Sequence, residues 1–556
     1  MLGANGGERA RPAWLPSAAL LLASAYVLCA DLDATPYDDS FFFKRFALNL
    51  VRHGSFSWNP SDGPVYGLTS QLFAALAVPL TWLFPGHFVV ASKIFLALSL
   101  MLLAVVVLRF AARAGVRGVD AALLTLLALG TPLSLLTPHT GMETSLCLAL
   151  LALTLSDMLS RETARSLPAA GMTALVYLCR PDAALIPALV FIVAERRRLG
   201  SVLSYVALLG LLLGLLWCVF RLYYGSALPL PFYAKTAGLS SYDSELRAAG
   251  LHGKIQHLLT FCAFGAPLAW VALRARDMRV SALLVVSAAF VAYQALLTDE
   301  IMGYRARFYA PALVPLTLAA ILAWGRGEAR SDVRAARSAW LVWAACIGVG
   351  YLAGLLESGS ASVLDRVPGT AYLAQLFLGV LLCGRASEGS SLSAQAVSFA
   401  SSGALVASAF LLRPPHVIRT ALDDATFLRR SSAQVTTTRG LFEVARCMPS
   451  AQTLYHSEIG IPGLVLPDWR IVDLVGLMSK PLARSRPPFD DYCLRDRPAV
   501  LFLPHKTYRA LNAEIRSSAC LRGYTLAVRD SSSPLYIRSD LSAAFNQCRR
   551  DPWRAE

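Results

Sequence analysis

The sequence has few charged residues. Asp, Glu, Lys and Arg make up 16% of its 556 residues, against about 25% in a typical soluble domain. This scarcity argues against an ordinary soluble enzyme. Disorder is excluded as well, because disordered chains combine low hydrophobicity with high net charge, whereas 56% of this chain is hydrophobic and its mean hydropathy is +0.52.

Several common signatures are missing. The sequence contains no P-loop, no dinucleotide-binding glycine fingerprint, no CxxC pair with metal-ligand spacing, no internal repeat and no long low-complexity segment. We therefore expect no nucleotide site, and the spacing of the residues suggests no metal site. Seven of the 11 cysteines lie in or beside apolar runs, at positions 29, 147, 179, 218, 262, 346 and 383, and are expected to be buried.

Long apolar runs dominate the sequence instead. A membrane span needs about 20 apolar residues, and we expect about 13 spans in all. The first, 14–30, could be a signal peptide, but its long core and weak cleavage site favour an uncleaved span. The pair that flanks Arg180-Pro181-Asp182 is short and is expected to form a broken or re-entrant element. The predicted spans after the first are 87–108, 121–137, 142–159, 167–179, 183–194, 202–220, 257–273, 280–297, 308–324, 339–355, 372–383 and 394–412.

The formal net charge of +15 comes largely from Arg residues in short loops between these runs. Positive charge in short loops marks the cytoplasmic side, and the pattern places the N-terminus inside. The apolar segment 67–84 would invert all later loops if it crossed the membrane. We therefore place it as a helix on the outer surface, interrupted by Pro79 and ended by Pro85-Gly86.

The odd number of spans then leaves the C-terminal part outside. The sequence predicts a polytopic α-helical module over residues 1–413, with a large first outer loop at 31–86, and an extracytoplasmic α/β domain over 414–556. Short β-rich runs at 499–503, 524–528 and 535–537 support this domain. Its four cysteines, at positions 447, 493, 520 and 548, could form two disulfides in any of three pairings.

The first outer loop carries two adjacent carboxylates, Asp38 and Asp39, before a segment with an apolar face at helical spacing. Two carboxylates at a membrane edge suit acid–base chemistry. The alternative, given equal weight, is that they cap the following helix and favour the positive end of its dipole.

Further ionisable residues fall in the later outer loops. His139 and Glu143 lie between two spans, with a structural histidine and a helix-terminal charge as the alternatives. Arg180 and Asp182 lie inside apolar sequence, where ionisable groups are functional or paired with each other. Lys235, Arg305 and Arg307, near Tyr233, suit a phosphate headgroup, although each cation alone is better explained by an interfacial position beside aromatic residues.

Taken in order, these residues resemble the GT-C superfamily of membrane glycosyltransferases, in particular the terminal arabinofuranosyltransferases of mycobacterial-type cell walls and their relatives. The resemblance covers almost the whole chain. The matching segments are Tyr37-Asp38-Asp39 to Trp58-Asn59-Pro60, Thr140-Gly141-Met142-Glu143-Thr144, Arg180-Pro181-Asp182, Tyr224-Gly225 to Phe232-Tyr233-Ala234-Lys235, Arg307-Phe308 with Pro311 and Pro315, and Ile471-Val472-Asp473-Leu474-Val475-Gly476-Leu477.

The resemblance implies an inverting transferase of the inner membrane, with its site on the extracytoplasmic side. The donor would be a polyprenyl-phosphate-linked sugar, most simply arabinofuranose, and the acceptor an envelope glycan, lipid or protein. Asp38 or Asp39 would be the general base, and the donor or substrate would contact Lys235, Arg305, Arg307, Arg180, Tyr233, His139, Glu143 and Asp182. No cofactor is implied, and a divalent metal stays open.

Two other functions fit part of the pattern. A transporter or flippase of a lipid-linked sugar would use the same cations without chemistry, but it has no need of a paired acid and an outer domain, and the inverted repeats of many transporters are missing. A receptor-like membrane protein whose outer domain binds glycan is the third interpretation.

Overall fold

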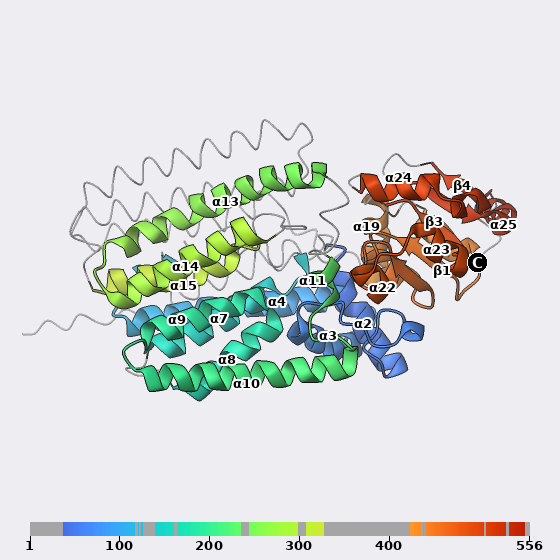
Figure 1. Ribbon diagram of the computed structural model, residues 1–556. Coiled ribbons are helices and arrows are strands. Elements are labelled where there is room, and N and C mark those ends of the chain that lie inside the picture. Colours follow the sequence, from blue (N-terminus) through green and yellow to red (C-terminus); the bar gives the residue numbers. More distant parts are fainter. Residues whose placement is uncertain are drawn as a thin grey trace, which may run out of the picture.

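The computed structural model describes residues 37–116, 120–121, 124–125, 140–160, 165–234, 244–298, 307–326, 423–434, 438, 440–504, 508–529 and 533–550. In Figure 1 a helical bundle fills one half of the molecule and a smaller α/β domain the other. The predicted spans 14–30, 339–355, 372–383 and 394–412 lie outside the described residues, as do most of 121–137 and the predicted domain boundary.

The bundle consists of α3 and of apolar helices that match the remaining predicted spans within a few residues, except that α13 begins 13 residues before the predicted span 257–273. They are α3 (Gln71–Leu83), α4 (Phe88–Arg113), α7 (Thr144–Ser160), α8 (Ser166–Cys179), α9 (Leu185–Ala194), α10 (Leu199–Tyr224), α13 (Ser244–Leu273), α14 (Met278–Leu297) and α15 (Ala310–Gly325). By length and composition α4, α10 and α14 are each able to cross a membrane, and five described apolar helices are shorter.

Helix α10 shows how much of this bundle faces outward. Its buried side chains are Tyr205, Phe220 and Tyr224, and most of its other apolar side chains are exposed. An apolar helix that packs along one face and exposes most of its other apolar side chains suits a lipid environment. The same geometry corrects one expectation: Cys147 and Cys179 are buried, but Cys218 and Cys262 are exposed, because in a bilayer an outward-facing position can be as apolar as an inward-facing one.

The helix α2 (Ser40–His53) lies at the end of the bundle that meets the α/β domain, next to α3 (Figure 1). It forms where the sequence places Phe41, Phe42, Phe43 and Phe46 on a buried face. It ends at Gly54, whose φ of 68° is a left-handed conformation that suits glycine.

The helix α3 occupies most of the segment predicted to lie on the outer surface. Ser70 caps its start by accepting a hydrogen bond from the Phe73 amide, and it ends at Phe84, as expected from Pro85-Gly86. The predicted interruption at Pro79 is wrong, since α3 continues through this residue. Packing of α3 against α2, α4 and α8 supports the turn that the proline would otherwise weaken.

The predicted break at Arg180-Pro181-Asp182 is confirmed. Helix α8 ends at Cys179, Arg180 is extended, and the short 3-10 helix η3 (Asp182–Ala184) leads into α9. A proline disfavours the helical conformation of the residue before it, so Pro181 accounts for the end of α8.

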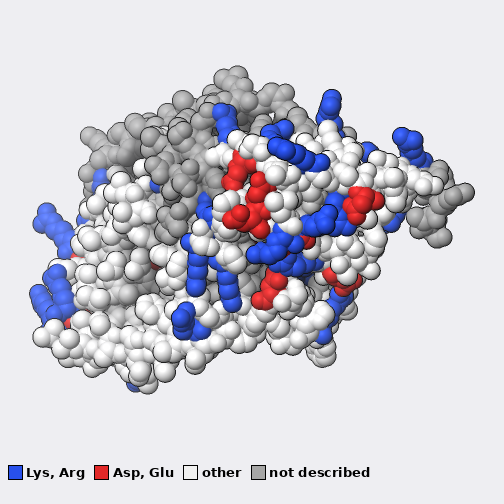
Figure 2. All heavy atoms as spheres, turned by 45° about the vertical axis from the view of Figure 1, so that its right-hand side comes forward, with Lys and Arg blue, Asp and Glu red and all other residues white. Residues whose placement is uncertain are grey.

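Three Arg-bearing loops meet at one end of the described bundle. At the end away from the α/β domain, Arg113 donates to Ser160 Oγ at 3.3 Å, Arg279 donates to the Leu159 carbonyl at 3.2 Å, and Arg326 pairs with Asp277. These Arg residues belong to three loops expected on one side. In Figure 2, acidic side chains gather on the α/β half, whereas the bundle surface is mostly uncharged, with Lys and Arg at its far edge.

The α/β domain contains a five-stranded sheet in the order β2-β1-β3-β5-β4. Strands β1, β2 and β3 are parallel, whereas β5 pairs antiparallel with β3 and β4. The strands are β1 (Thr453–His456), β2 (Arg470–Asp473), β3 (Val500–Phe502), β4 (Tyr524–Val528) and β5 (Leu535–Arg538). The three predicted strands are confirmed as β3, β4 and β5, and β1 and β2 were not predicted.

Helices connect and flank these strands. They are α19 (Asp424–Gln434), α20 (Leu441–Cys447), α21 (Gly460–Val465), α22 (Lys480–Arg484), α23 (Phe489–Asp496), α24 (Arg509–Ser517), η8 (Cys520–Gly523) and α25 (Ser539–Arg550). Helix α21 joins β1 to β2 and thereby places the carboxyl ends of these parallel strands at the same edge of the sheet.

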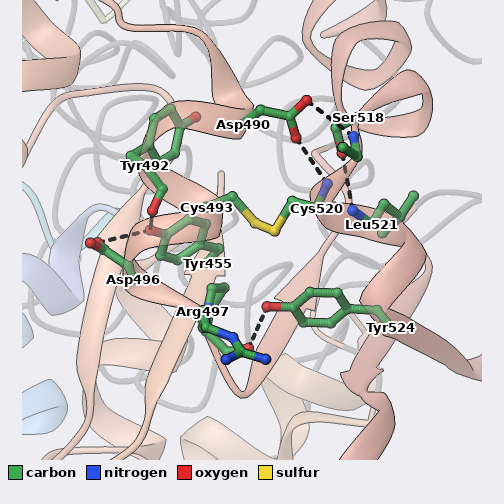
Figure 3. Close-up of a disulfide and its surroundings, with 12 residues drawn as sticks. Tyr455, Asp490, Tyr492, Cys493, Asp496, Arg497, Ser518, Cys520, Leu521 and Tyr524 are labelled. Atoms are coloured by element: carbon green, nitrogen blue, oxygen red, sulfur yellow. Dashed lines mark hydrogen bonds between the residues drawn. A yellow bond between two sulfur atoms is a disulfide. The ribbon is translucent and has the colours of Figure 1, made fainter.

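Two disulfides close the domain, and they settle the pairing that the sequence left open. Cys447 bonds to Cys548, and Cys493 bonds to Cys520. Figure 3 shows the second bridge, beside which Asp490 accepts the amide of Cys520 at 2.9 Å and so adds a second link between α23 and η8.

Two side chains of the first outer loop anchor this domain to the bundle. The buried guanidinium of Arg45 donates to the carbonyl oxygens of Gly463, Leu466 and Trp469. The Asn59 amide both accepts from and donates to the backbone of Ile471 in β2, each at 2.9 Å. The α/β domain is thus held directly against the segment that carries Asp38 and Asp39.

Candidate functional site

The Asp38 carboxylate is bound by the α/β domain. Its two oxygens accept the backbone N–H groups of Gly460 at 2.8 Å and Ile461 at 2.7 Å, at the start of α21. Gly460 approaches so closely that a Cβ atom there would overlap the Asp38 carbonyl oxygen. Asp38 therefore lies where the first outer loop meets the carboxyl edge of the sheet.

Asp39 is the residue before α2, but its side chain makes no capping hydrogen bond. Within the described residues, the structure therefore does not support the alternative in which the two side chains cap α2. Asp38 turns to the other domain, and Asp39 lies close enough to act on the charge of Asp38.

Four carboxylates share this edge of the sheet. Burial raises the pKa of Asp38 to about 7, against two N–H bonds that lower it, and the neighbouring Asp39 and Asp473 charges raise it further. Burial also raises the pKa of Glu458 to about 8, with Asp38, Asp39 and Asp473 adding to the shift. A carboxyl that titrates near neutral pH is suited to take or give a proton.

Asp473, the third carboxylate of this group, is held by the backbone of the turn that follows it. It ends β2, and its oxygens accept the N–H groups of Val475 at 2.9 Å and Met478 at 3.0 Å. Burial raises its pKa to about 6 although these bonds lower it. In the same turn Gly476 has a φ of 92°, which explains why glycine stands in this segment.

Arg180 and Asp182 form the ion pair that was one of the two interpretations of this motif. Arg180 donates from Nε and Nη2 to the two Asp182 oxygens at 2.9 and 3.0 Å. Gln294, near the end of α14, also donates to Asp182 at 2.7 Å. Both charges of the pair are thus compensated within the bundle.

Arg307 is different. Its side chain is 8% exposed, and within the described part of the chain its Nε and Nη1 atoms are buried without a hydrogen-bond acceptor. An unsatisfied buried guanidinium is costly, so a position of this kind is suited to an anionic group. Arg307 stands directly before α15, and its carbonyl oxygen lies 3.5 Å from Arg180 Nη1.

A short path of contacts links the acids to the cations. The amide of Tyr37, next to Asp38, donates to the Thr140 carbonyl at 3.3 Å. Glu143, three residues further and buried, precedes α7, and its charge acts on Arg180. The acid cluster and Arg307 therefore belong to the same end of the bundle.

The other predicted contact residues are placed in part. Tyr233 lies in α11 (Leu230–Ala234), where the Arg484 guanidinium of α22 lies over its ring, 5.1 Å from the centroid. His139, Lys235 and Arg305 lie outside the described residues. No group of three or more His, Cys, Asp or Glu residues with metal-binding geometry occurs among the residues that the structure describes.

Two functional candidates escaped the sequence analysis. Glu458 follows β1, a strand of four residues that was not predicted, so no motif pointed to it. Arg45 follows Lys44 on a helix and resembles an ordinary surface charge. Its hydrogen bonds to Gly463 and Leu466 span more than 400 residues of sequence, and no local pattern signals a contact of that kind.

Comparison with known proteins gives a likeness of fold. No family model matches the sequence, and no curated protein matches it. Two solved structures are similar: ArnT from Cupriavidus metallidurans bound to undecaprenyl phosphate, and the same protein in the apo state. Each has a TM-score of 0.59 and 15% identity. The first covers 95% of this chain and 98% of its own, and the second covers 94% and 98%.

At this identity the likeness concerns the fold. The shared fold is a mostly helical module followed by a small C-terminal sheet domain. The likeness extends over nearly the whole length of both chains, so it includes the bundle, the first outer loop and the α/β domain together.

Proposed function

We propose that the protein is an inverting glycosyltransferase that moves a sugar from a polyprenyl-phosphate donor to an acceptor of the bacterial envelope. The observation that carries the proposal is the buried Arg307 guanidinium, whose Nε and Nη1 atoms have no acceptor within the described residues. It lies at the same end of the bundle as a carboxyl with a pKa of about 7. The Arg307 guanidinium can stabilise the departing phosphate, and the Asp38 carboxyl can take the proton of the attacking hydroxyl.

The reaction needs no further nucleophile. Asp38, with Asp39 beside it, takes the proton from the acceptor hydroxyl as its oxygen attacks the anomeric carbon. The bond between that carbon and the phosphate oxygen breaks, and the phosphate leaves with the electron pair. Arg307, together with Lys235 and Arg305, stabilises the charge that grows on the phosphate. A single displacement inverts the anomeric centre.

The sugar is proposed to be arabinofuranose, from the motif resemblance, with aminoarabinose and mannose as alternatives. The ArnT structure with undecaprenyl phosphate shows that a protein of this fold binds such a lipid, which supports the lipid part of the donor. Tyr233, His139, Glu143, Arg180 and Asp182 are proposed to line the site, the last two as a positioning pair.

The location is proposed to be the inner membrane, with the site and the α/β domain outside the cytoplasm. Two disulfides in this domain fit an oxidising compartment. The Arg-rich loops at the opposite end of the bundle fit the cytoplasmic side.

The test is a transfer assay with purified protein in lipid nanodiscs. A panel of synthetic polyprenyl-phosphate sugars is offered with envelope polysaccharide, lipopolysaccharide or pilin as acceptor, and release of polyprenyl phosphate is measured. We expect release from one donor and loss of release in Asp38→Asn and in Asp39→Asn. The exposed Asp491 gives the control Asp491→Asn. Movement of an intact donor across proteoliposomes, with no cleavage, would instead identify a flippase.

A further inference from the structure

A turn of the α/β domain, residues 456–461, encloses the Asp38 carboxylate. Gly460 and Ile461 donate to its two oxygens, and the close approach at Gly460 leaves no space for a larger residue. At the start of the turn, buried His456 accepts the N–H groups of Ser457 at 2.8 Å and Glu458 at 3.2 Å on Nδ1. The turn is therefore fixed at both ends, and it reaches Asp38 from the opposite domain.

Glu458 lies in the middle of this turn and is half-buried. No hydrogen bond or ion pair engages its carboxyl within the described residues. The charges that act on it are those of Asp38 and Asp39, before α2, and Asp473, at the end of β2. The cations next in α2 are engaged elsewhere, because Lys44 pairs with Asp424 and Arg45 donates to backbone carbonyls.

We propose that the 456–461 turn is a positioning element of the catalytic centre: Gly460 and Ile461 orient the Asp38 carboxylate, and Glu458 keeps the second proton of the acidic cluster. The inference rests on the proposed transferase function. It makes the α/β domain a component of the site, and Glu458 acts through Asp38 and through the charge of the cluster.

The role of Glu458 follows from its place beside Asp38 in the acidic cluster. Burial and the neighbouring carboxylates raise the pKa of both groups, and because a proton kept on Glu458 lowers the negative charge around Asp38, it leaves Asp38 free to act as the base. While Glu458 is protonated, the acidic cluster that an anionic donor approaches carries one negative charge fewer. As the pH rises further Glu458 ionises, and its negative charge repels the anionic donor and weakens donor binding.

The first test compares wild type with Glu458→Gln, which keeps the shape of the protonated side chain. Between pH 7 and pH 9 the KM for the donor is expected to rise several-fold more in wild type than in Glu458→Gln, because the ionisation of Asp38 is common to both proteins and that of Glu458 is not. The fall of activity below pH 7 remains in Glu458→Gln. A merely structural role would change KM by the same factor at both pH values. The same rise in both proteins would overturn the proposal.

The second test is Gly460→Ala, with Gly523→Ala in the same domain as the matched control, because a Cβ there meets open space. The added methyl group pushes the two N–H donors away from Asp38. Their loss raises the pKa of that carboxyl, so the acid limb of kcat/KM should move up by about one pH unit. If the limb stays in place in a folded variant, the positioning role is wrong. If the variant does not fold, Glu458→Gln decides.

Binding of undecaprenyl phosphate separates this inference from the proposed function. If no sugar donor is turned over, the transferase proposal fails, but the dissociation constant of this lipid is still measurable at pH 7 and pH 9. Ionisation of the lipid phosphate affects both proteins equally. We expect weaker binding at pH 9 in wild type relative to Glu458→Gln, and equal ratios would overturn the role of Glu458 independently.

Discussion

Lowering the pH should stop the reaction far above the range in which an ordinary aspartate is protonated. With a pKa of about 7, Asp38 is about 90% ionised at pH 8, about 9% at pH 6 and about 1% at pH 5. If the ionised form is the base, kcat/KM should fall about tenfold from pH 8 to pH 6 and about a hundredfold to pH 5. An unperturbed Asp would lose almost nothing over this range.

The assay is initial-rate release of polyprenyl phosphate at constant ionic strength. Unfolding through this group does not confound it: a carboxyl whose pKa is raised in the folded state binds its proton more tightly there. Its contribution to stability therefore falls as the pH rises from about 4 to about 7, and acid does not remove it. Asp38→Asn should lower kcat/KM by about 10²–10⁴ and abolish the acid limb. An acid limb near pH 4, or one that survives in Asp38→Asn, would refute the assignment.

Four further outcomes follow from the described contacts. Arg307→Gln should weaken binding of undecaprenyl phosphate by about 10- to 100-fold, while Arg196→Gln, at an exposed position, should not, as measured by the dissociation constant of the lipid. Replacing Cys447 and Cys548 by Ser opens a link over 101 residues and should cost up to about 5 kcal/mol of unfolding free energy, seen as a lower melting temperature. Arg45→Met should cost about 3 kcal/mol and expose the α/β domain to protease. A reporter that works only in the cytoplasm should be inactive when fused to the C-terminus.

The apolar pattern predicted most of the described bundle, because the length and the composition of a span can both be read from its own stretch of sequence. Helices α4, α7, α8, α14 and α15 begin and end within a few residues of the runs read from the sequence. Which face of a helix turns inward was harder to predict. In a soluble helix polar residues mark the exposed side, whereas a lipid-facing side is as apolar as the core, and this is why Cys218 and Cys262 were misplaced.

Only the part of the site that comes from the first outer loop was predictable from the sequence. Asp38 and Asp39 stand out because adjacent carboxylates are rare at a membrane edge. The backbone amides that hold the Asp38 carboxylate come from the other end of the sequence, 422 and 423 residues away. They lie between β1 and β2, two four-residue strands that are too short to show a period. No spacing rule connects such segments, so Glu458 and the orienting amides become visible only when the domains are seen together.

The two hydrogen bonds between Asn59 and Ile471 have a consequence for assembly. Strand β2 is one of the two edge strands of the sheet, and an uncovered edge strand offers its free peptide groups to any second polypeptide. Here the Asn59 amide binds both the N–H and the carbonyl of Ile471, much as a neighbouring strand would. Removing the Asn59 side chain would leave the N–H and carbonyl of Ile471 free to pair with a strand of another chain. At a crowded membrane surface such pairing leads to aggregation, which competes with correct folding.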